Sequence, residues 1–172
     1  MIKYTPKTKD ELKALVRDEL INLGDIDTSN ITDMSELFLC STRKNFSGIE
    51  KWDVSNVRDM KRMFAFCEHF NTNISSWDVS NVTDMSRMFW SCIYYNQPLN
   101  DWNTVNLIQV KGMFSFCKKF NQPLNNWNVS NIYDFTAIFN CCENFNQPLD
   151  SWNMCKARIT SHMFANCKNF NR

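Results

Sequence analysis

The sequence repeats itself at an interval of 25 residues. Tryptophan recurs in one phase at Trp52, Trp77, Trp102, Trp127 and Trp152. Cysteine keeps the same step at Cys67, Cys92, Cys117, Cys142 and Cys167. A period of about 20 to 50 residues indicates a repeat architecture in which each unit buries its apolar face against its neighbours. The repeats therefore constrain the shape of the molecule far more than its biochemical function.

Two spacings alternate inside each repeat. The pattern LxxWxV, as at Leu124, Trp127 and Val129, alternates between apolar and polar positions and predicts a short strand. The apolar positions that follow are spaced as on one face of a short helix; in the second full repeat they are Val82, Met85, Met88, Phe89 and Cys92. We therefore expect an α/β repeat solenoid with one short parallel strand and one short helix in each repeat of about 25 residues, curved so that the strands line a concave face.

The chain before the repeats predicts an N-terminal capping helix. Thr8 and Glu11 have the spacing of a capping box, an apolar face that includes Leu20 continues to Leu23, and Gly24 stands where a C-cap belongs. We expect residues 1–24 to cover the first coil and residues 25–172 to form about six repeats in one continuous domain. No cap is evident after the last repeat, so this end is a candidate for contact with a second copy.

The repeated cysteines favour a buried, reduced ladder, with a disulfide set or a metal site as the alternative. Zinc is disfavoured because the sequence has no CxxC and two histidines. Asp59, Asp84 and Asp134 are expected to stabilise the first turns of their helices rather than to bind calcium. We expect no metal or other cofactor.

Composition excludes several function classes. The net charge is +1, with basic and acidic residues intermixed, which argues against nucleic acid as a partner. No apolar run is long enough to cross a bilayer. The first residues are too charged for a signal peptide, which predicts a cytoplasmic location for the chain as given.

The outward positions of the predicted strands form the candidate partner-binding face. They are Asp53, Ser55, Ser76, Asp78, Ser80, Asp101, Asn103, Asn126, Asn128, Ser130 and Asn153. Their amides, carboxylates and hydroxyls suit a protein loop or a sugar, and the alternative is that they only solvate the sheet. The five regularly spaced tryptophans are expected in the core rather than on a sugar-binding surface.

The strings WDVSNVTDMSRMF, MFxxC and FNQPLxxW resemble the BspA-like bacterial surface-protein repeat, also described as a PARCEL-type, lipoprotein-associated repeat. The resemblance runs from Asp25 to Arg172 and implies a right-handed coil similar to the leucine-rich repeat. It also implies a cell-surface or secreted location and a role in adhesion or host contact.

The sequence shows no catalytic triad, P-loop or dinucleotide-binding fingerprint, so we expect no enzymatic activity. The leading expectation is a non-enzymatic module that binds a protein through the concave strand face. The alternatives are a structural subunit that joins a partner, including a second copy, through its uncapped C-terminal coil, and a glycan-binding module.

Overall fold

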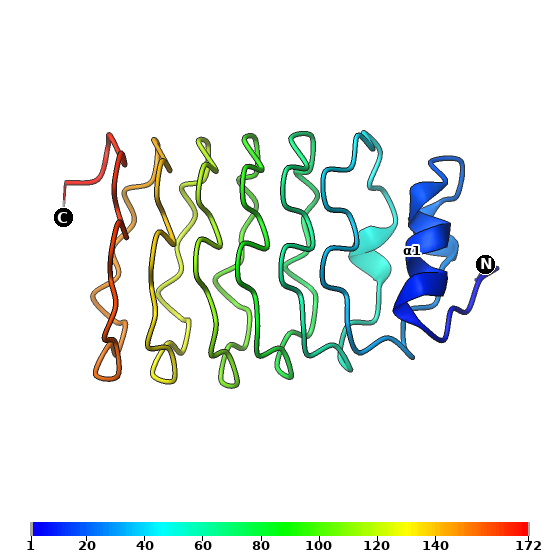
Figure 1. The fold of residues 1–172 in the computed structure, drawn as a ribbon, viewed down its shortest axis with the longest axis horizontal. Helices are drawn as coiled ribbons and strands as arrows, with labels where there is room; N and C mark the ends of the chain where they lie inside the picture. Colours follow the sequence, from blue (N-terminus) through cyan, green and yellow to red (C-terminus); the bar gives the residue numbers. More distant parts are fainter. Residues whose placement is uncertain (1, 172) are drawn as a thin grey trace.

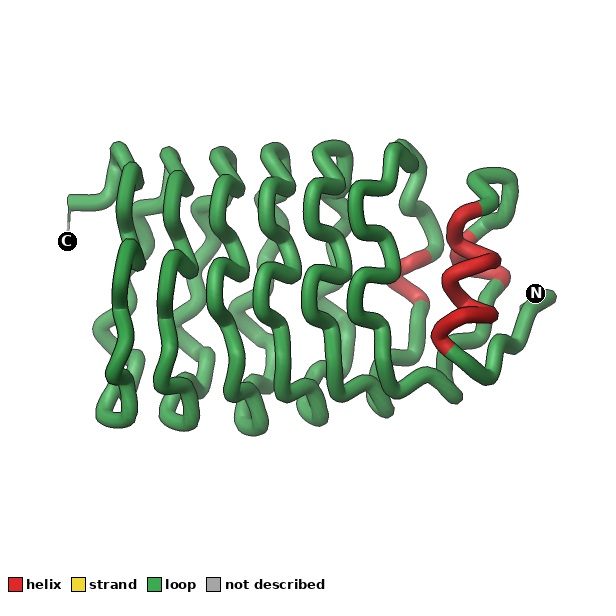
Figure 2. The backbone as a smooth tube through the Cα atoms, viewed as in Figure 1, coloured by secondary structure: helices red, strands yellow, loops and turns green. Residues whose placement is uncertain are grey.

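The computed structural model describes residues 2–171, which form a row of stacked coils with a helix at one end (Figure 1). The α-helix, α1, spans Lys9–Arg17, and two short 3-10 helices span Leu23–Asp25 (η1) and Ile49–Lys51 (η2). Turns and extended segments make up the repeats (Figure 2). No helix within residues 2–171 has both the length and the apolar character needed to cross a membrane.

The predicted helix in each repeat is wrong. Arg87 and Ser91 have φ angles of 56° and 63°, whereas a right-handed helix needs φ near −63°. Local hydrogen bonds close tight turns, as from the Met88 amide to the Met85 carbonyl at 3.1 Å, with a positive φ at the third turn residue as in a type II turn. Alternate amides bond instead to the next coil, so that the Phe89 amide donates to the Met113 carbonyl at 3.0 Å. Each segment is thus a run of four-residue turns.

The apolar stripe that suggested a helix is nevertheless buried. Turns that advance by four residues bring nearly the same positions inward as a helix of 3.6 residues per turn. The buried side chains of this stripe in the second full repeat are Val82, Met85, Met88, Phe89 and Cys92.

The predicted sheet is wrong as well. Trp127 and Val129 are buried and Asn128 is exposed, so the expected alternation holds. Within the described residues, however, the coils are joined by isolated parallel bridges, such as Asp59 to Asp84, and not by strands. The α/β solenoid of leucine-rich-repeat type, with its concave strand face, is therefore not the structure, because backbone pairing between coils is concentrated in the turn segment.

The core contains two columns of stacked aromatic rings. Within one coil, Phe64 and Phe70 stack with centroids 3.8 Å apart. Between coils, Phe64 stacks on Phe89 at 5.9 Å and Phe70 on Tyr95 at 5.4 Å. The columns continue through Phe114, Phe120, Phe139, Phe145, Phe164 and Phe170. Each coil thus covers the aromatic face of its neighbour.

The tryptophan ladder also hydrogen-bonds each coil to the preceding one. Trp77 donates its indole N–H to the Ile49 carbonyl at 3.1 Å, and Trp127 donates to the Leu99 carbonyl at 2.8 Å. The same bond is made by Trp52, Trp102 and Trp152. These tryptophans are buried, so the prediction that they belong to the core is confirmed.

The cysteine ladder makes an equivalent set of bonds deeper in the core. The thiol of Cys117 donates to the Phe89 carbonyl at 2.9 Å, and that of Cys142 donates to the Phe114 carbonyl at 2.7 Å. Cys67, Cys92 and Cys167 bond in the same way. All eight cysteines have free thiols in this structure, and the five in the ladder are buried, which confirms that the ladder belongs to the core. Burial raises the pKa of these thiols, to about 12 for Cys67.

Helix α1 begins where the capping box predicts and ends earlier than expected. The Thr8 hydroxyl accepts from the Glu11 amide at 3.2 Å, and Leu12 is fully buried. The helix stops at Arg17 instead of Leu23, and Leu20, expected on the apolar face, is 95% exposed. The buried Arg43 explains this end, because its guanidinium donates to carbonyl oxygens at the end of the helix and in the following loop, including those of Val16 (3.0 Å) and Asp18 (3.2 Å).

Candidate functional site

The polar residues predicted to bind a partner lie on turns beside the tryptophan ladder. Most are exposed, but their side chains also stabilise the turns themselves. Asp78 accepts a hydrogen bond from the Ser80 amide at 3.0 Å, and Asn103 accepts from the Val105 amide at 3.3 Å. Asp53, Asn128 and Asn153 make the same bond to the residue two positions later. Such Asx turns give this row a structural role.

Other polar side chains of this surface bond one coil to the next. The Asn81 amide group donates to the Ser55 carbonyl at 2.8 Å, and the Ser76 hydroxyl donates to the Glu50 carbonyl at 3.4 Å. Asn126 donates to Asp101 at 3.5 Å. Much of the predicted face is therefore already engaged within the molecule.

The row of aspartates does not stabilise helix termini, because its members begin tight turns. The Asp84 carboxylate accepts from the Ser86 amide at 2.7 Å, and Asp59 and Asp134 accept in the same way from Lys61 and Thr136. Burial, helped by the charges of Asp84 and Asp33, raises the pKa of Asp59. Across residues 2–171, no group of three or more histidine, cysteine or acidic side chains is placed to hold a metal ion.

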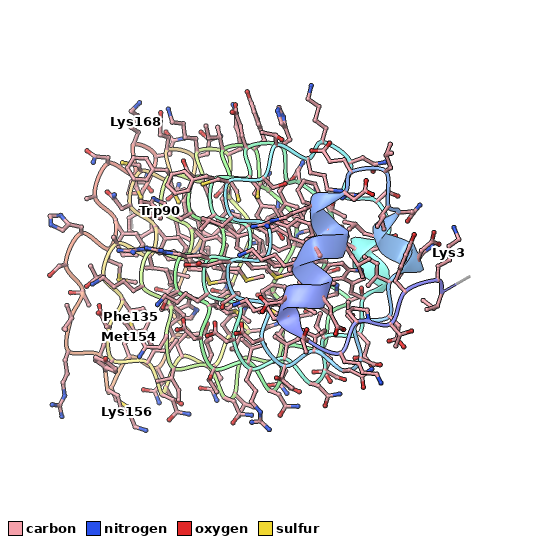
Figure 3. All side chains as sticks on the ribbon, turned by 45° about the vertical axis from the view of Figure 1, so that its right-hand side comes forward. Lys3, Trp90, Phe135, Met154, Lys156 and Lys168 are labelled. Atoms are coloured by element: carbon pink, nitrogen blue, oxygen red, sulfur yellow. The ribbon has the colours of Figure 1, made fainter. Side chains whose placement is uncertain are left out.

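A groove lies on a different surface of the repeats, formed by the turns that contain the residues with positive φ. We call it the Trp90 groove; its cavity volume is about 230 Å³. It is lined by Arg87, Trp90, Lys111, Gly112, Ser115, Phe116, Thr136, Ala137 and Asn140. Trp90 lies away from α1 (Figure 3). Three successive coils therefore contribute to one depression.

The groove exists because one repeat differs from its neighbours. Gly112 occupies the turn position that carries Arg87 in the preceding coil and Ala137 in the next, and its φ is 63°. A Cβ on Gly112 would stand 3.3 Å from Cγ of Arg87, so the Arg87 side chain lies against the glycine. Ser115 is likewise small at the position that holds Trp90 one coil earlier. These two small residues lower the surface between the aromatic side chains.

An aromatic strip borders the groove. The rings of Phe66 and Trp90 lie 4.8 Å apart, and the Arg87 guanidinium carbon lies 5.0 Å from the centre of the Trp90 ring. Phe66 is 44% exposed and Phe116 38% exposed. Exposed aromatic groups and arginine are the side chains most enriched at protein interfaces.

The groove is cationic. Arg87 and Lys111 form no ion pair with another described residue, and no acidic side chain lines the groove. The polar groups Ser115 and Asn140 contact each other at 3.4 Å. Sequence patterns alone missed this site, although Trp90 and Gly112 could have signalled it as departures from the repeat.

A second hollow lies at the junction between α1 and the first coil. Its volume is about 390 Å³, and its charged lining includes Lys13, Arg17, Glu19 and Glu36. Because both signs of charge are balanced there, it offers no clear electrostatic preference for a ligand.

The comparisons with known proteins give a family and no function. No curated protein and no solved structure matches the chain. A family described as "Mycoplasma protein of unknown function, DUF285" matches residues 11–119 and again residues 95–172, so that the two matches together span nearly all of the repeats. The chain belongs to the DUF285 family.

Proposed function

We propose that the chain is a non-enzymatic interaction module that binds a protein partner through the Trp90 groove. The observation that carries this proposal is the combination of the half-buried Trp90 and the exposed Phe116 with two cations, Arg87 and Lys111, that form no ion pair with another described residue. Elsewhere on the repeats, polar side chains such as Asp78 and Asn81 already bond within the molecule. Repeat proteins commonly use the surface of the stack for binding.

The resemblance to BspA-like repeats supports a location at the cell surface and a role in adhesion or host contact, as part of the same proposal. The groove lacks an acid, a base and a nucleophile arranged together, which favours binding over catalysis. The polar face that includes Ser76 and Asn126 is less suited to a partner, because these side chains already bond within the molecule.

Site-specific photocrosslinking tests this function. A photoreactive phenylalanine analogue would replace Phe116 at the groove, Ser76 on the polar face or Phe170 at the C-terminal coil, each in the full chain expressed in its source cells. We expect a discrete protein adduct from position 116, identified by mass spectrometry, and none from position 170. Absence of any protein adduct from position 116, with adducts from another position, would contradict the groove as the binding surface.

A second candidate is assembly through the C-terminal coil. In the preceding coil, the amides of Phe135, Ala137, Phe139 and Cys141 donate to carbonyls of the last coil, at 2.8, 2.9, 3.0 and 2.7 Å. The equivalent amides of the last coil form no hydrogen bond within residues 2–171; they belong to Thr160, His162, Phe164 and Asn166. A partner that offers a row of carbonyl oxygens fits this end better than a second copy of the same end, which would oppose donors with donors.

Light scattering across a range of protein concentrations tests this alternative. Self-assembly of the last coil against another part of a second copy predicts a rise in mass with concentration that Phe170→Glu abolishes, whereas the groove proposal predicts a monomer at all concentrations.

Glycan binding is a third candidate. The five ladder tryptophans are buried, which leaves Trp90 as the tryptophan available to a sugar.

A further inference from the structure

We infer that the Trp90 groove binds an acidic segment of its protein partner, with one apolar side chain of that segment seated between Trp90 and Phe116. The inference rests on the proposed function and adds the chemistry of the partner. Three properties of the groove support it: its size, its charge and the state of its polar groups.

The size of the groove suits a single side chain. Its volume of about 230 Å³ lies below the range of about 300–1,000 Å³ that is usual for small-molecule sites. Interfaces between proteins commonly place one aromatic or aliphatic side chain in a small pocket at their centre. Trp90 and Phe116 supply the apolar walls of such a pocket, and Gly112 and Ser115 supply its floor.

The charge of the groove selects carboxylates. Arg87 and Lys111 lie on its lining without an acidic partner, although the whole chain has a net charge of only +1. In the preceding coil the residue at the position of Arg87, Arg62, is paired with Glu36 at 3.2 Å. Two cations and a nearly neutral molecule are too few for a nucleic-acid backbone, which requires many phosphate contacts. Two or three carboxylates beside an apolar side chain match this distribution.

The polar groups favour a peptide over an acidic sugar. Sugar recognition needs several free hydrogen-bonding groups beside an aromatic ring. On the floor of the groove, Ser115 and Asn140 already contact each other, and Trp90 is covered on one side by Arg87 and flanked by Phe66. Apart from the Thr136 hydroxyl, the contacts that remain available on the lining are apolar and cationic.

Trp90 also provides a specific signal for binding. The chain has six tryptophans, and the five ladder members are buried with their indole N–H groups bonded to carbonyls. Trp90 is half-buried and lines the groove. A ligand in the groove should shift the indole resonance of Trp90 and leave the other five nearly unchanged.

The test is a titration of the full ¹⁵N-labelled chain with a capped heptapeptide that has a central phenylalanine flanked by aspartate and glutamate. Lysine replaces the acidic residues in a second peptide, and alanine replaces the phenylalanine in a third. We expect the first peptide to shift the Trp90 indole with a Kd in the millimolar range or tighter, and both other peptides to bind at least about tenfold more weakly.

Matched variants test whether Arg87 and Lys111 are the cations that bind the acidic peptide. Arg87→Gln combined with Lys111→Gln should weaken binding of the acidic peptide about tenfold or more. Lys61→Gln is the control, since Lys61 is exposed at the same repeat position as Lys111 and lies outside the groove. It should leave binding unchanged.

The inference is overturned if the acidic peptide leaves the Trp90 resonance unmoved up to about 5 mM, or if the basic peptide binds equally well. It is also overturned if a galacturonic acid tetrasaccharide shifts Trp90 and the peptide does not, which would assign the groove to acidic sugars. A protein adduct from position 116 together with a failed peptide titration would retain the proposed function and reject only the acidic partner.

Discussion

The backbones of Gly48 and Gly24 lie in direct contact. A Cβ on Gly48 would stand 2.2 Å from the Gly24 nitrogen and 2.7 Å from its Cα, and Gly48 has a φ of 95°. This contact joins η2 to η1 and thereby places the first regular coil against the N-terminal part of the chain.

Gly48→Ala should therefore destabilise the protein strongly. The substitution adds a clash with backbone atoms to an unfavourable φ, so we expect a loss of about 3 kcal/mol in the free energy of unfolding. Urea denaturation followed by circular dichroism measures it. Ser47→Ala, at an exposed neighbour, is the control and should change stability by less than about 0.5 kcal/mol. Equal stability of both variants would show that the two backbones are not in contact.

Gly112 and Ala137 allow a reciprocal test of the left-handed turns. They occupy the same position in successive coils with φ angles of 63° and 56°. Gly112→Ala should cost about 1 kcal/mol, whereas Ala137→Gly should be neutral or stabilise by up to about 1 kcal/mol, because glycine alone adopts this region without strain. Chemical denaturation of the two variants side by side provides the measurement. A clear loss of stability in Ala137→Gly would contradict the turn geometry.

These turns explain why the sequence predicts burial better than backbone conformation. Inward positions such as Met88 and Cys117 follow from the period alone, because any coil that closes around a core in about 25 residues must bury them. The left-handed conformation has no matching signal in the sequence. A positive φ is usually marked by glycine, but Arg87 and His162 occupy such positions here. A four-residue turn period was therefore interpreted as a helix.

The groove was unpredictable for a related reason. The groove forms because Gly112 and Ser115 have smaller side chains than the equivalent residues of the preceding coil, and because three coils lie next to each other. A search for repeated residues does not detect such departures from the repeat. The start of α1 was predictable because the capping interaction between Thr8 and Glu11 is local. Its end was not, because it depends on Arg43, which is distant in sequence.

Tyr95→Phe should stabilise the protein. Tyr95 is fully buried in an aromatic column between Phe70 and Phe120, and its hydroxyl has no hydrogen-bond partner among the described residues. Removal of an unsatisfied buried hydroxyl should add about 1–2 kcal/mol to the free energy of unfolding. Thermal and urea denaturation test this, with Tyr94→Phe at an exposed site as a neutral control. A destabilised Tyr95→Phe variant would mean that the hydroxyl does have a partner.

Arg43→Met should weaken the junction between α1 and the repeats. The Arg43 side chain is buried, and its hydrogen bonds satisfy several carbonyl oxygens, including that of Asn45 at 2.8 Å. Methionine fills similar space without donors, so we expect a loss of about 3 kcal/mol. Amide hydrogen exchange should show increased exchange in α1 in this variant. The exposed neighbour provides the control, Lys44→Met, which should exchange like the parent protein. Unchanged protection of α1 in Arg43→Met would contradict this role.

Alkaline pH should destabilise the chain through its cysteine ladder. Burial raises the pKa of the thiols from an ordinary value of 9.0 to about 12 for Cys67 and about 11 for Cys167, and well above the ordinary value for Cys117. Above about pH 9 the unfolded chain loses these protons while the folded chain keeps them, so stability is full below pH 9 and falls as the pH rises. Each buried thiol contributes a slope of at most about 1.4 kcal/mol per pH unit.

Urea midpoints measured under reducing conditions at several pH values from 7.5 to about 10.5 would test this slope. Cys117→Ser removes one titrating group and keeps a hydroxyl that can donate to the Phe89 carbonyl, so its stability should fall less steeply with pH than that of the parent. Cys155→Ser, at an exposed site, should keep the parent slope. If the midpoint stays constant up to pH 10, the ladder thiols are not buried as the structure places them, because buried thiols must resist ionisation that the unfolded chain undergoes.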